Sequence, residues 1–130
     1  MASVPAELKY TKEHEWAKRE GDRVRVGITE YAQEQLGDVV FVELPKVGAK
    51  VTAHKAFGVV ESVKAVSDLF APISGEVVET NGELPQKPET VNKDPYGKGW
   101  MIVVKPSSAA EWDQLLSAQQ YEQFVSEAAH

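Results

Sequence analysis

A single lysine between two strand-like segments is the side chain best placed to do chemistry. One segment covers residues 57–64 and ends on Lys64, and the other covers residues 65–72. A lysine at the end of a strand, followed by the small Ala65, is expected to project from the tip of a hairpin. Ser62, on the other side of the lysine, is also small.

Lys64 taken by itself fits several interpretations. As a solvated turn residue it does no chemistry, and as a partner of Glu61 or Asp68 it forms an exposed ion pair worth at most about 1 kcal/mol. As a Schiff-base or nucleophilic lysine it needs a desolvated pocket that favours the neutral amine. The nearby carboxylates favour the charged amine, which argues against an enzyme built on Lys64.

Sulfur and histidine chemistry is scarce in this chain. It contains no cysteine, which excludes disulfides, thiolate nucleophiles and cysteine-bound metals. His14, His54 and His130 stand singly and form no i, i+4 pair of the kind that binds zinc on a helix. We expect neither a metal site nor a catalytic triad, and any sulfur redox chemistry has to arrive on a cofactor.

The segments around the lysine are mostly strand-like. Val24, Val26 and Ile28 recur with the period of two that is typical of a half-buried strand. The β-branched run at residues 39–44 stops at Pro45, and its length favours a strand covered on both faces. Further strand and turn signals lie at Lys9–Lys18, Glu20–Asp22, Ile73–Glu79 and Trp100–Val104.

Helix signals are short and lie between or after these strands. Thr29 is a candidate N-cap and Gly37 a candidate end of a two-turn helix. Its expected buried residues are Tyr31, Ala32 and Leu36. A single helical turn is expected near Glu89–Asn92.

The C-terminal region changes to helical periodicity. Ser108 with Glu111, and Ser117 with Gln120, each have the spacing of a capping box. The apolar residues after the two boxes would point to opposite sides of one continuous helix. We therefore predict two C-terminal helices with a break near Ser117.

The composition is that of one globular domain. The chain has 130 residues, of which 42% are hydrophobic and 26% charged, enough for one buried core. We expect a single domain over residues 1–130, mainly β or α+β, with a short tail at 1–7. No apolar run approaches the roughly 18 residues of a membrane span, and no signal-peptide pattern is present. The net charge of −6 argues against nucleic-acid binding.

The residues around Lys64 closely resemble the lipoyl-attachment segment of the glycine cleavage H proteins. The hairpin context is formed by Glu61, Ser62, Val63 and Ala65, and it is followed by Ser67-Asp68 and Ala71–Val77. Further blocks resemble the same family, in the same order, along nearly the whole chain: Tyr10–Trp16, Val26–Thr29, Tyr31–Gln33, Leu36–Pro45 and Asn92–Trp100.

This resemblance implies a carrier and not a catalyst. Lys64 would bear lipoate as N6-lipoyllysine, with no catalytic residue elsewhere. The implied fold is a barrel-sandwich hybrid of two antiparallel sheets with a lysine-bearing hairpin and short flanking helices. That fold agrees with the strand-rich pattern and the two C-terminal helices predicted above.

The family also implies a set of partners. The decarboxylase that uses pyridoxal phosphate loads an aminomethyl group, and the aminomethyltransferase passes the one-carbon unit to tetrahydrofolate. Dihydrolipoyl dehydrogenase, an FAD enzyme, reoxidises the dithiol that remains, and lipoate-attaching enzymes modify the lysine. We expect a monomer that meets these partners in turn.

Two carboxylates are implied to support the arm. In the family the loaded arm is thought to fold back into a surface cleft, and residues matching Glu15 and Asp68 are candidates for holding its amine. A carboxylate in a partly desolvated cleft suits a cation. From the residues alone, Glu15 and Asp68 are equally compatible with solvated carboxylates.

Alternatives remain for the type of carrier and its compartment. Lipoyl and biotinyl domains of other complexes are shorter, and their usual tripeptides are Asp-Lys-Ala and Met-Lys-Met, whereas Val63-Lys64-Ala65 occurs here. A relay protein that delivers lipoate to 2-oxoacid dehydrogenase complexes fits the same residues. The N-terminus favours a bacterial cytoplasm, although a mature form from the mitochondrial matrix would look identical.

Overall fold

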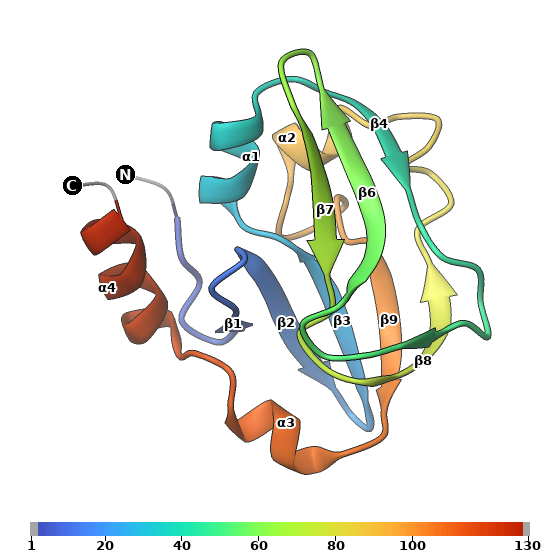
Figure 1. Cartoon of the computed structure of the whole chain (residues 1–130), viewed down its shortest axis with the longest axis vertical. Helices are drawn as coiled ribbons and strands as arrows, with labels where there is room; N and C mark the ends of the chain where they lie inside the picture. The colour runs from blue at the N-terminus through green and yellow to red at the C-terminus, as the bar shows by residue number, and fades with distance from the viewer. Residues whose placement is uncertain (1–2, 129–130) are drawn as a thin grey trace.

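Two antiparallel sheets form the body of the molecule (Figure 1). The computed structural model describes residues 3–128. The larger sheet has the strand order β1-β2-β3-β9-β8-β5, and the smaller sheet has the order β4-β6-β7. The expected sandwich of two antiparallel sheets is confirmed. The strands are β1 Lys9–Tyr10, β2 Glu15–Glu20, β3 Arg23–Ile28, β4 Val39–Glu43, β5 Lys50–Val51, β6 Ala56–Ser62, β7 Val66–Phe70, β8 Gly75–Thr80 and β9 Ile102–Pro106.

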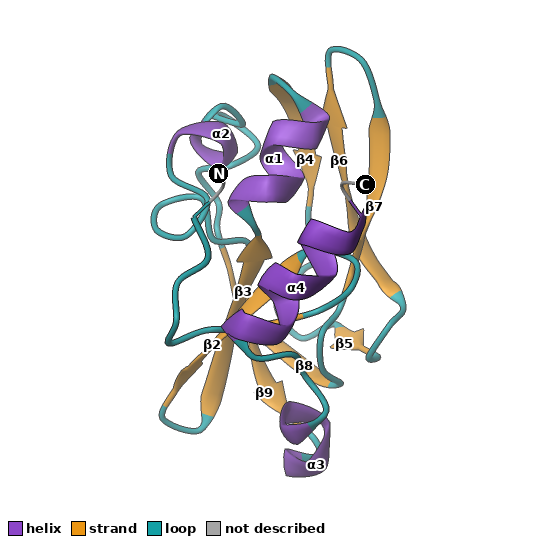
Figure 2. Ribbon diagram, turned by 90° about the vertical axis from the view of Figure 1, so that its left-hand side faces the viewer, coloured by secondary structure: helices purple, strands orange, loops and turns teal. Residues whose placement is uncertain are grey.

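Short helices flank the sheets, as Figure 2 shows. The helices of the described chain are α1 Glu30–Leu36, α2 Thr90–Lys93, α3 Ala109–Asp113 and α4 Ala118–Ala128. The predicted helical turn near Glu89–Asn92 is α2. Within residues 3–128, no helix combines the length and apolarity needed to cross a membrane.

Local signals set the two ends of α1 as predicted. The Thr29 hydroxyl accepts a hydrogen bond from the Ala32 backbone N–H at 3.2 Å, and Gly37 ends the helix with a φ of 79°. Leu36 is buried, but Tyr31 and Ala32 are only half-buried. The prediction that these two are buried was wrong because both line an open cleft, although Ala32 also packs against the core and the Tyr31 ring lies against His14.

The break between the C-terminal helices is confirmed. The Ser117 N–H donates to Gln120 Oε1 at 2.9 Å, and the Gln120 N–H donates back to Ser117 Oγ at 3.2 Å. The capping box predicted at Ser108 does not form. Glu111 instead accepts hydrogen bonds from the Ser74 backbone N–H at 2.7 Å and the Ser74 hydroxyl at 2.9 Å, and this distant contact replaces the local one.

Two strand predictions need correction. Val40 and Phe41 in β4 are 54% and 43% exposed, so only one face of this strand is covered. Val39 and Val42 pack into the core, whereas the outer face of the smaller sheet meets solvent. The last strand begins at Ile102 rather than two residues earlier.

Aromatic packing attaches α4 to the N-terminal strand. Tyr10 and Tyr121 are fully buried and stack with their ring centroids 4.7 Å apart. Leu8, Trp16 and Ala118 complete this cluster. A helix as short as α4 is marginal by itself, so burial of these aromatic side chains supplies most of its stability. The C-terminal helix is therefore held next to the turn that leads from β1 to β2.

Candidate functional site

Strands β6 and β7 form a hairpin (Figure 1), and Lys64 lies in the turn at its tip. Val60 pairs with Ser67, and Glu61 with Val66, which leaves residues 63–65 as the turn. The Lys64 side chain is exposed, and its Cε lies close to Gly37, where α1 ends. The sequence-predicted position of Lys64 on a hairpin tip is confirmed.

Ser62 fixes the backbone of this turn. Its hydroxyl accepts hydrogen bonds from the N–H groups of Lys64 at 3.3 Å and Ala65 at 3.1 Å, and its own N–H donates to the Ala65 carbonyl at 2.8 Å. The Val63 N–H donates to the Asp38 carbonyl at 3.0 Å, which ties the tip to the start of β4. The lysine is thus an exposed side chain on a rigid turn, which suits a long arm that must be aimed from a fixed point.

The charged neighbours of Lys64 do not hold its amine. Among the described residues, neither Glu61 nor Asp68 forms an ion pair with Lys64. The side chain is exposed and is not among the residues that line the cleft beside the hairpin. The arrangement does not supply the desolvated pocket that a Schiff-base lysine requires.

A cleft of about 460 Å³ lies alongside the hairpin. It is bounded by β7, by α1 and by the turn before β2. Its lining residues are Glu13, His14, Glu15, Ile28, Tyr31, Ala32, Gln35, Leu36, Val60, Ala65, Val66, Ser67, Asp68 and Leu69. Because the cleft-lining Ala65 follows Lys64 directly, the cleft lies next to the point at which a group attached to the lysine begins.

Glu15 lies inside the protein at the cleft wall and is only 2% exposed. Its Oε1 accepts a hydrogen bond from the Thr11 hydroxyl at 2.7 Å, and its Oε2 accepts one from the Phe70 N–H at 3.3 Å. Burial raises the pKa of Glu15 to about 8, although both hydrogen bonds act in the opposite direction. The solvated-carboxylate interpretation of Glu15 is therefore wrong, and near neutral pH this group is mainly a neutral acid.

Asp68 differs from Glu15, although both line the cleft. It is exposed and lies in β7, where successive side chains point to opposite faces. The buried Leu69 side chain points into the core, so the Ser67 side chain points to the same face of the sheet. The Asp68 side chain points to the opposite face. The structure thus brings Asp68 to the cleft rim rather than to its wall.

The free edge of β7 contributes backbone groups that sequence reasoning missed. The Phe70 N–H points away from β6, toward Glu15. Backbone groups on one edge of a strand recur at every second residue, so those of Asp68 and Val66 face the same side. Val66 and Asp68 both line the cleft, and their N–H and C=O groups therefore lie on the side of β7 that faces Glu15. The available signal was the position of β7 at the edge of a three-stranded sheet, which only the strand order reveals.

A chain of hydrogen bonds connects the cleft to α4. His14, which has a φ of 73°, places its Nδ1 2.8 Å from the Tyr121 hydroxyl, and that hydroxyl lies 2.7 Å from Thr29 Oγ1. Burial raises the pKa of Tyr121 and lowers that of His14, so both groups are uncharged at neutral pH. The chain joins the turn before β2, the N-cap of α1 and the C-terminal helix.

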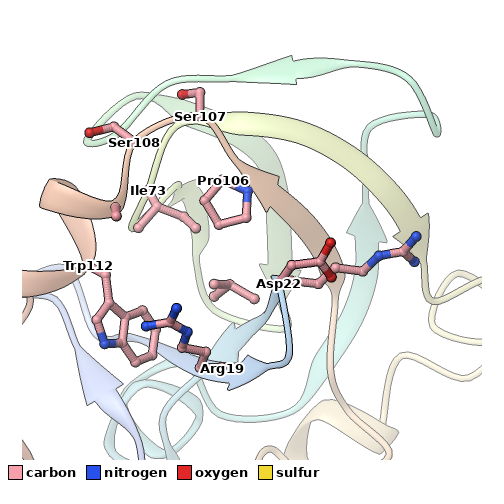
Figure 3. A pocket seen from close by; sticks show the side chains of 10 residues that line it. Arg19, Asp22, Ile73, Pro106, Ser107, Ser108 and Trp112 are labelled. Carbon is pink, nitrogen blue, oxygen red and sulfur yellow. The ribbon is translucent and has the colours of Figure 1, made fainter.

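A second hollow, of about 220 Å³, lies near the β2–β3 turn and α3. Figure 3 shows Arg19 and Trp112 on one side of it, with Ser107 and Ser108 on another. The β2–β3 turn and α3, which border this hollow, lie at the opposite end of the molecule from the hairpin tip (Figure 1), and none of the sequence-predicted site residues lines the hollow.

Metal-binding groups do not gather in the described chain. Within residues 3–128, no three His, Cys, Asp or Glu side chains are grouped in a way that could hold a metal ion. His54 lies 3.6 Å from Glu13, and His130 falls outside the described residues.

Comparisons with known proteins agree with one another. Residues 8–128 match the family described as glycine cleavage H-protein. The glycine cleavage system H protein of Geobacillus kaustophilus is 62% identical, covering 96% of this chain and 98% of that protein. The H protein of Bacillus subtilis is 57% identical with the same coverage. The crystal structure of a Mycobacterium marinum H protein has a TM-score of 0.85 and 44% identity, over 98% of this chain and 100% of that chain.

Proposed function

This chain belongs to the glycine cleavage H-protein family, and from that premise we propose that Lys64 is the residue that bears its lipoyl group. The protein is a non-catalytic lipoyl carrier of the glycine cleavage system. The observation that supports Lys64 is its exposed position on a turn fixed by Ser62, directly beside the cleft.

The residues around Lys64 fit this group. The amine is accessible, and its neighbours Ala65 and Ser67 are small. Bound lipoate supplies a dithiolane whose sulfur atoms accept and release the one-carbon unit. Acylation replaces the ammonium with a neutral amide, so the formal charge of the protein changes from −6 to −7. No cysteine occurs in the sequence, so the arm carries the single dithiol of the holoprotein.

Glu15 is the cleft residue suited to a cationic amine on the arm. In the absence of a cation its carboxyl group is mainly neutral, because burial raises its pKa to about 8. An ammonium group within hydrogen-bond distance favours the ionised carboxylate and lowers this pKa. Glu15 then releases a proton and forms a charge-assisted hydrogen bond in a site with restricted water. Asp68, on the rim, meets the arm at the entrance.

Three enzymes are the proposed catalytic partners. Membership of the glycine cleavage system supports the decarboxylase that uses pyridoxal phosphate, the tetrahydrofolate-dependent aminomethyltransferase and the FAD-containing dihydrolipoyl dehydrogenase. Lipoate-attaching enzymes complete the set. The bacterial relatives support a cytoplasmic location.

The Lys64→Arg variant tests the carrier site. Arginine keeps the charge at an exposed position, so thermal unfolding should be unchanged, but a guanidinium cannot form the lipoyl amide. We expect no glycine–bicarbonate exchange in the system reconstituted with the decarboxylase. Lys46→Arg, at another exposed turn, is the matched control and should retain exchange. Exchange near the wild-type level in the Lys64 variant would refute the proposal.

A further inference from the structure

Exposed apolar side chains cluster at the hairpin tip. The large hydrophobic residues that the described chain exposes are Val40 at 54%, Phe41 at 43%, Val47 at 63%, Val63 at 76% and Val66 at 66%. All of these except Val47 lie on β4, on β7 or in the turn that carries Lys64. We call the set Val40, Phe41, Val63 and Val66 the apolar collar.

Strand register brings the collar together. Phe41 pairs with Glu61, and Glu61 pairs with Val66, so these three side chains form one row across the outer face of the smaller sheet. Val40 is the extra residue of the irregularity between Val39 and Phe41. Val63 adjoins Lys64 and is tied through its N–H to the Asp38 carbonyl, two residues before Val40. The collar therefore borders the lysine from both edge strands.

Packing within the molecule does not explain these residues. Single exposed apolar residues are ordinary on protein surfaces, but a contiguous group beside a functional residue marks an interaction site. Val40, Val63 and Val66 leave more than half of their surface in water and Phe41 leaves 43%, so the fold gains little from burying them. A polar residue of similar shape would serve the strands equally well.

We propose that the apolar collar is the docking surface for the enzyme that acylates Lys64. This inference rests on the proposed attachment site. An unmodified lysine amine reaches only about 6 Å from its Cα, so an enzyme acting on it must touch the hairpin. Enzymes that act on the end of a lipoyl arm work at roughly twice that distance and approach the hairpin less closely. The collar thus fits an attaching enzyme better than a later partner.

The acidic residues near the apolar collar indicate which charge the partner should carry. Glu61 lies between Phe41 and Val66 in the same row, and Glu43 and Asp68 flank it in the next row across the sheet. Acidic side chains therefore lie both within the apolar row and beside it. The matching surface on an acyltransferase combines apolar side chains with lysine and arginine, and association should weaken as ionic strength rises.

The reaction at the collar is a balanced acyl transfer. The neutral amine of Lys64 attacks the acyl carbon of a lipoyl adenylate, which the attaching enzyme makes from lipoate and ATP with release of pyrophosphate. The N–C bond forms, and the bond from the acyl carbon to the phosphate oxygen breaks. AMP leaves with the electron pair, and the nitrogen loses one proton to give the amide.

The test compares isosteric variants at and away from the collar. Val40→Thr combined with Val63→Thr keeps side-chain shape and strand propensity and touches no cleft-lining residue. Val47→Thr, at an exposed position in the turn after β4, is the matched control. A lipoate–protein ligase with lipoate and ATP acylates each protein, and intact mass follows the reaction at protein concentrations below KM.

We expect kcat/KM for acylation to fall roughly fivefold to thirtyfold in the double variant and to stay at the wild-type value in Val47→Thr. Equal rates for all three proteins would overturn the collar as a docking surface. If dihydrolipoyl dehydrogenase reoxidises the dithiol of the fully lipoylated double variant with an equal loss of kcat/KM, the assignment to the attaching enzyme is wrong. Wild-type protein acylated elsewhere than Lys64 would instead refute the proposed function. Thermal unfolding reports folding, and Val63→Thr alone provides a second variant that also lies outside the cleft lining.

Discussion

The buried carboxyl group of Glu15 should make the stability of the protein depend on pH in a specific way. Glu15 is 2% exposed, and burial raises its pKa from 4.5 to about 8. Below pH 4.5 the group is protonated in both the folded and the unfolded chain, so it has no effect on their balance. As pH rises from 4.5 to about 8, the unfolded chain loses this proton while the folded chain keeps it.

The direction of this pH dependence follows from the number of protons that the folded and the unfolded chain bind. Because the folded state binds more protons in this interval, the free energy of unfolding falls as pH rises. Each pH unit removes about 1.4 kcal/mol, and the full interval removes at most about 5 kcal/mol. Above pH 8 the loss is complete and the contribution no longer changes. The Thr11 and Phe70 hydrogen bonds keep the loss from being larger.

The variant Glu15→Gln isolates this effect. Glutamine has nearly the same shape and cannot ionise, so its unfolding free energy should lack the contribution of this group. Urea unfolding of wild type and variant, measured by tryptophan fluorescence between pH 5 and pH 9, gives a difference profile. We expect the variant to gain several kcal/mol relative to wild type as pH rises across this range. Glu43→Gln, at an exposed position of β4, controls for the loss of one carboxylate.

Two parallel pH profiles, separated by a constant, would refute the reasoning. They would mean that Glu15 has the same proton affinity in the folded and the unfolded chain. Its burial would then not desolvate the carboxyl group, and the neutral acid described at the cleft wall would not exist.

Two further predictions concern the cleft. Glu15→Ala should leave lipoylation unchanged but speed ammonia release from the aminomethyl-loaded protein roughly tenfold to a hundredfold, because a buried charge-assisted hydrogen bond is worth about 1.5–3 kcal/mol. Timed ammonia release with the aminomethyltransferase absent measures it, and identical decay rates would contradict it. Tyr121→Phe removes the hydroxyl that lies between His14 and Thr29, so the protein should lose about 1–3 kcal/mol in urea unfolding; unchanged stability would show that the hydrogen-bond chain contributes nothing.

Features with local causes could be predicted from the sequence. The α1 helix begins at the Thr29 cap and ends at Gly37, and both signals lie within one short segment. The position of Lys64 between two strand arms is local in the same sense. The break before α4 was predictable because the Ser117 and Gln120 groups are three residues apart.

Features with distant causes could not be predicted. The Ser108 capping box failed because Glu111 bonds to Ser74, which lies 37 residues earlier. An apolar run shows that β4 is a strand but not how many of its faces are covered, so the exposure of Phe41 was missed. The hydrogen bond between His14 and Tyr121 spans 107 residues and depends on where α4 docks.

The location of the lipoyl group tests the central claim most directly. Protein isolated from its native host is digested with trypsin, which does not cut after an acylated lysine. The account predicts a peptide that begins at Ala56, contains Lys64 as an uncut internal residue and carries the mass of one lipoyl group. Every other lysine should be unmodified. Cleavage after Lys64, with no added mass there in protein that is fully active in glycine cleavage, would contradict it.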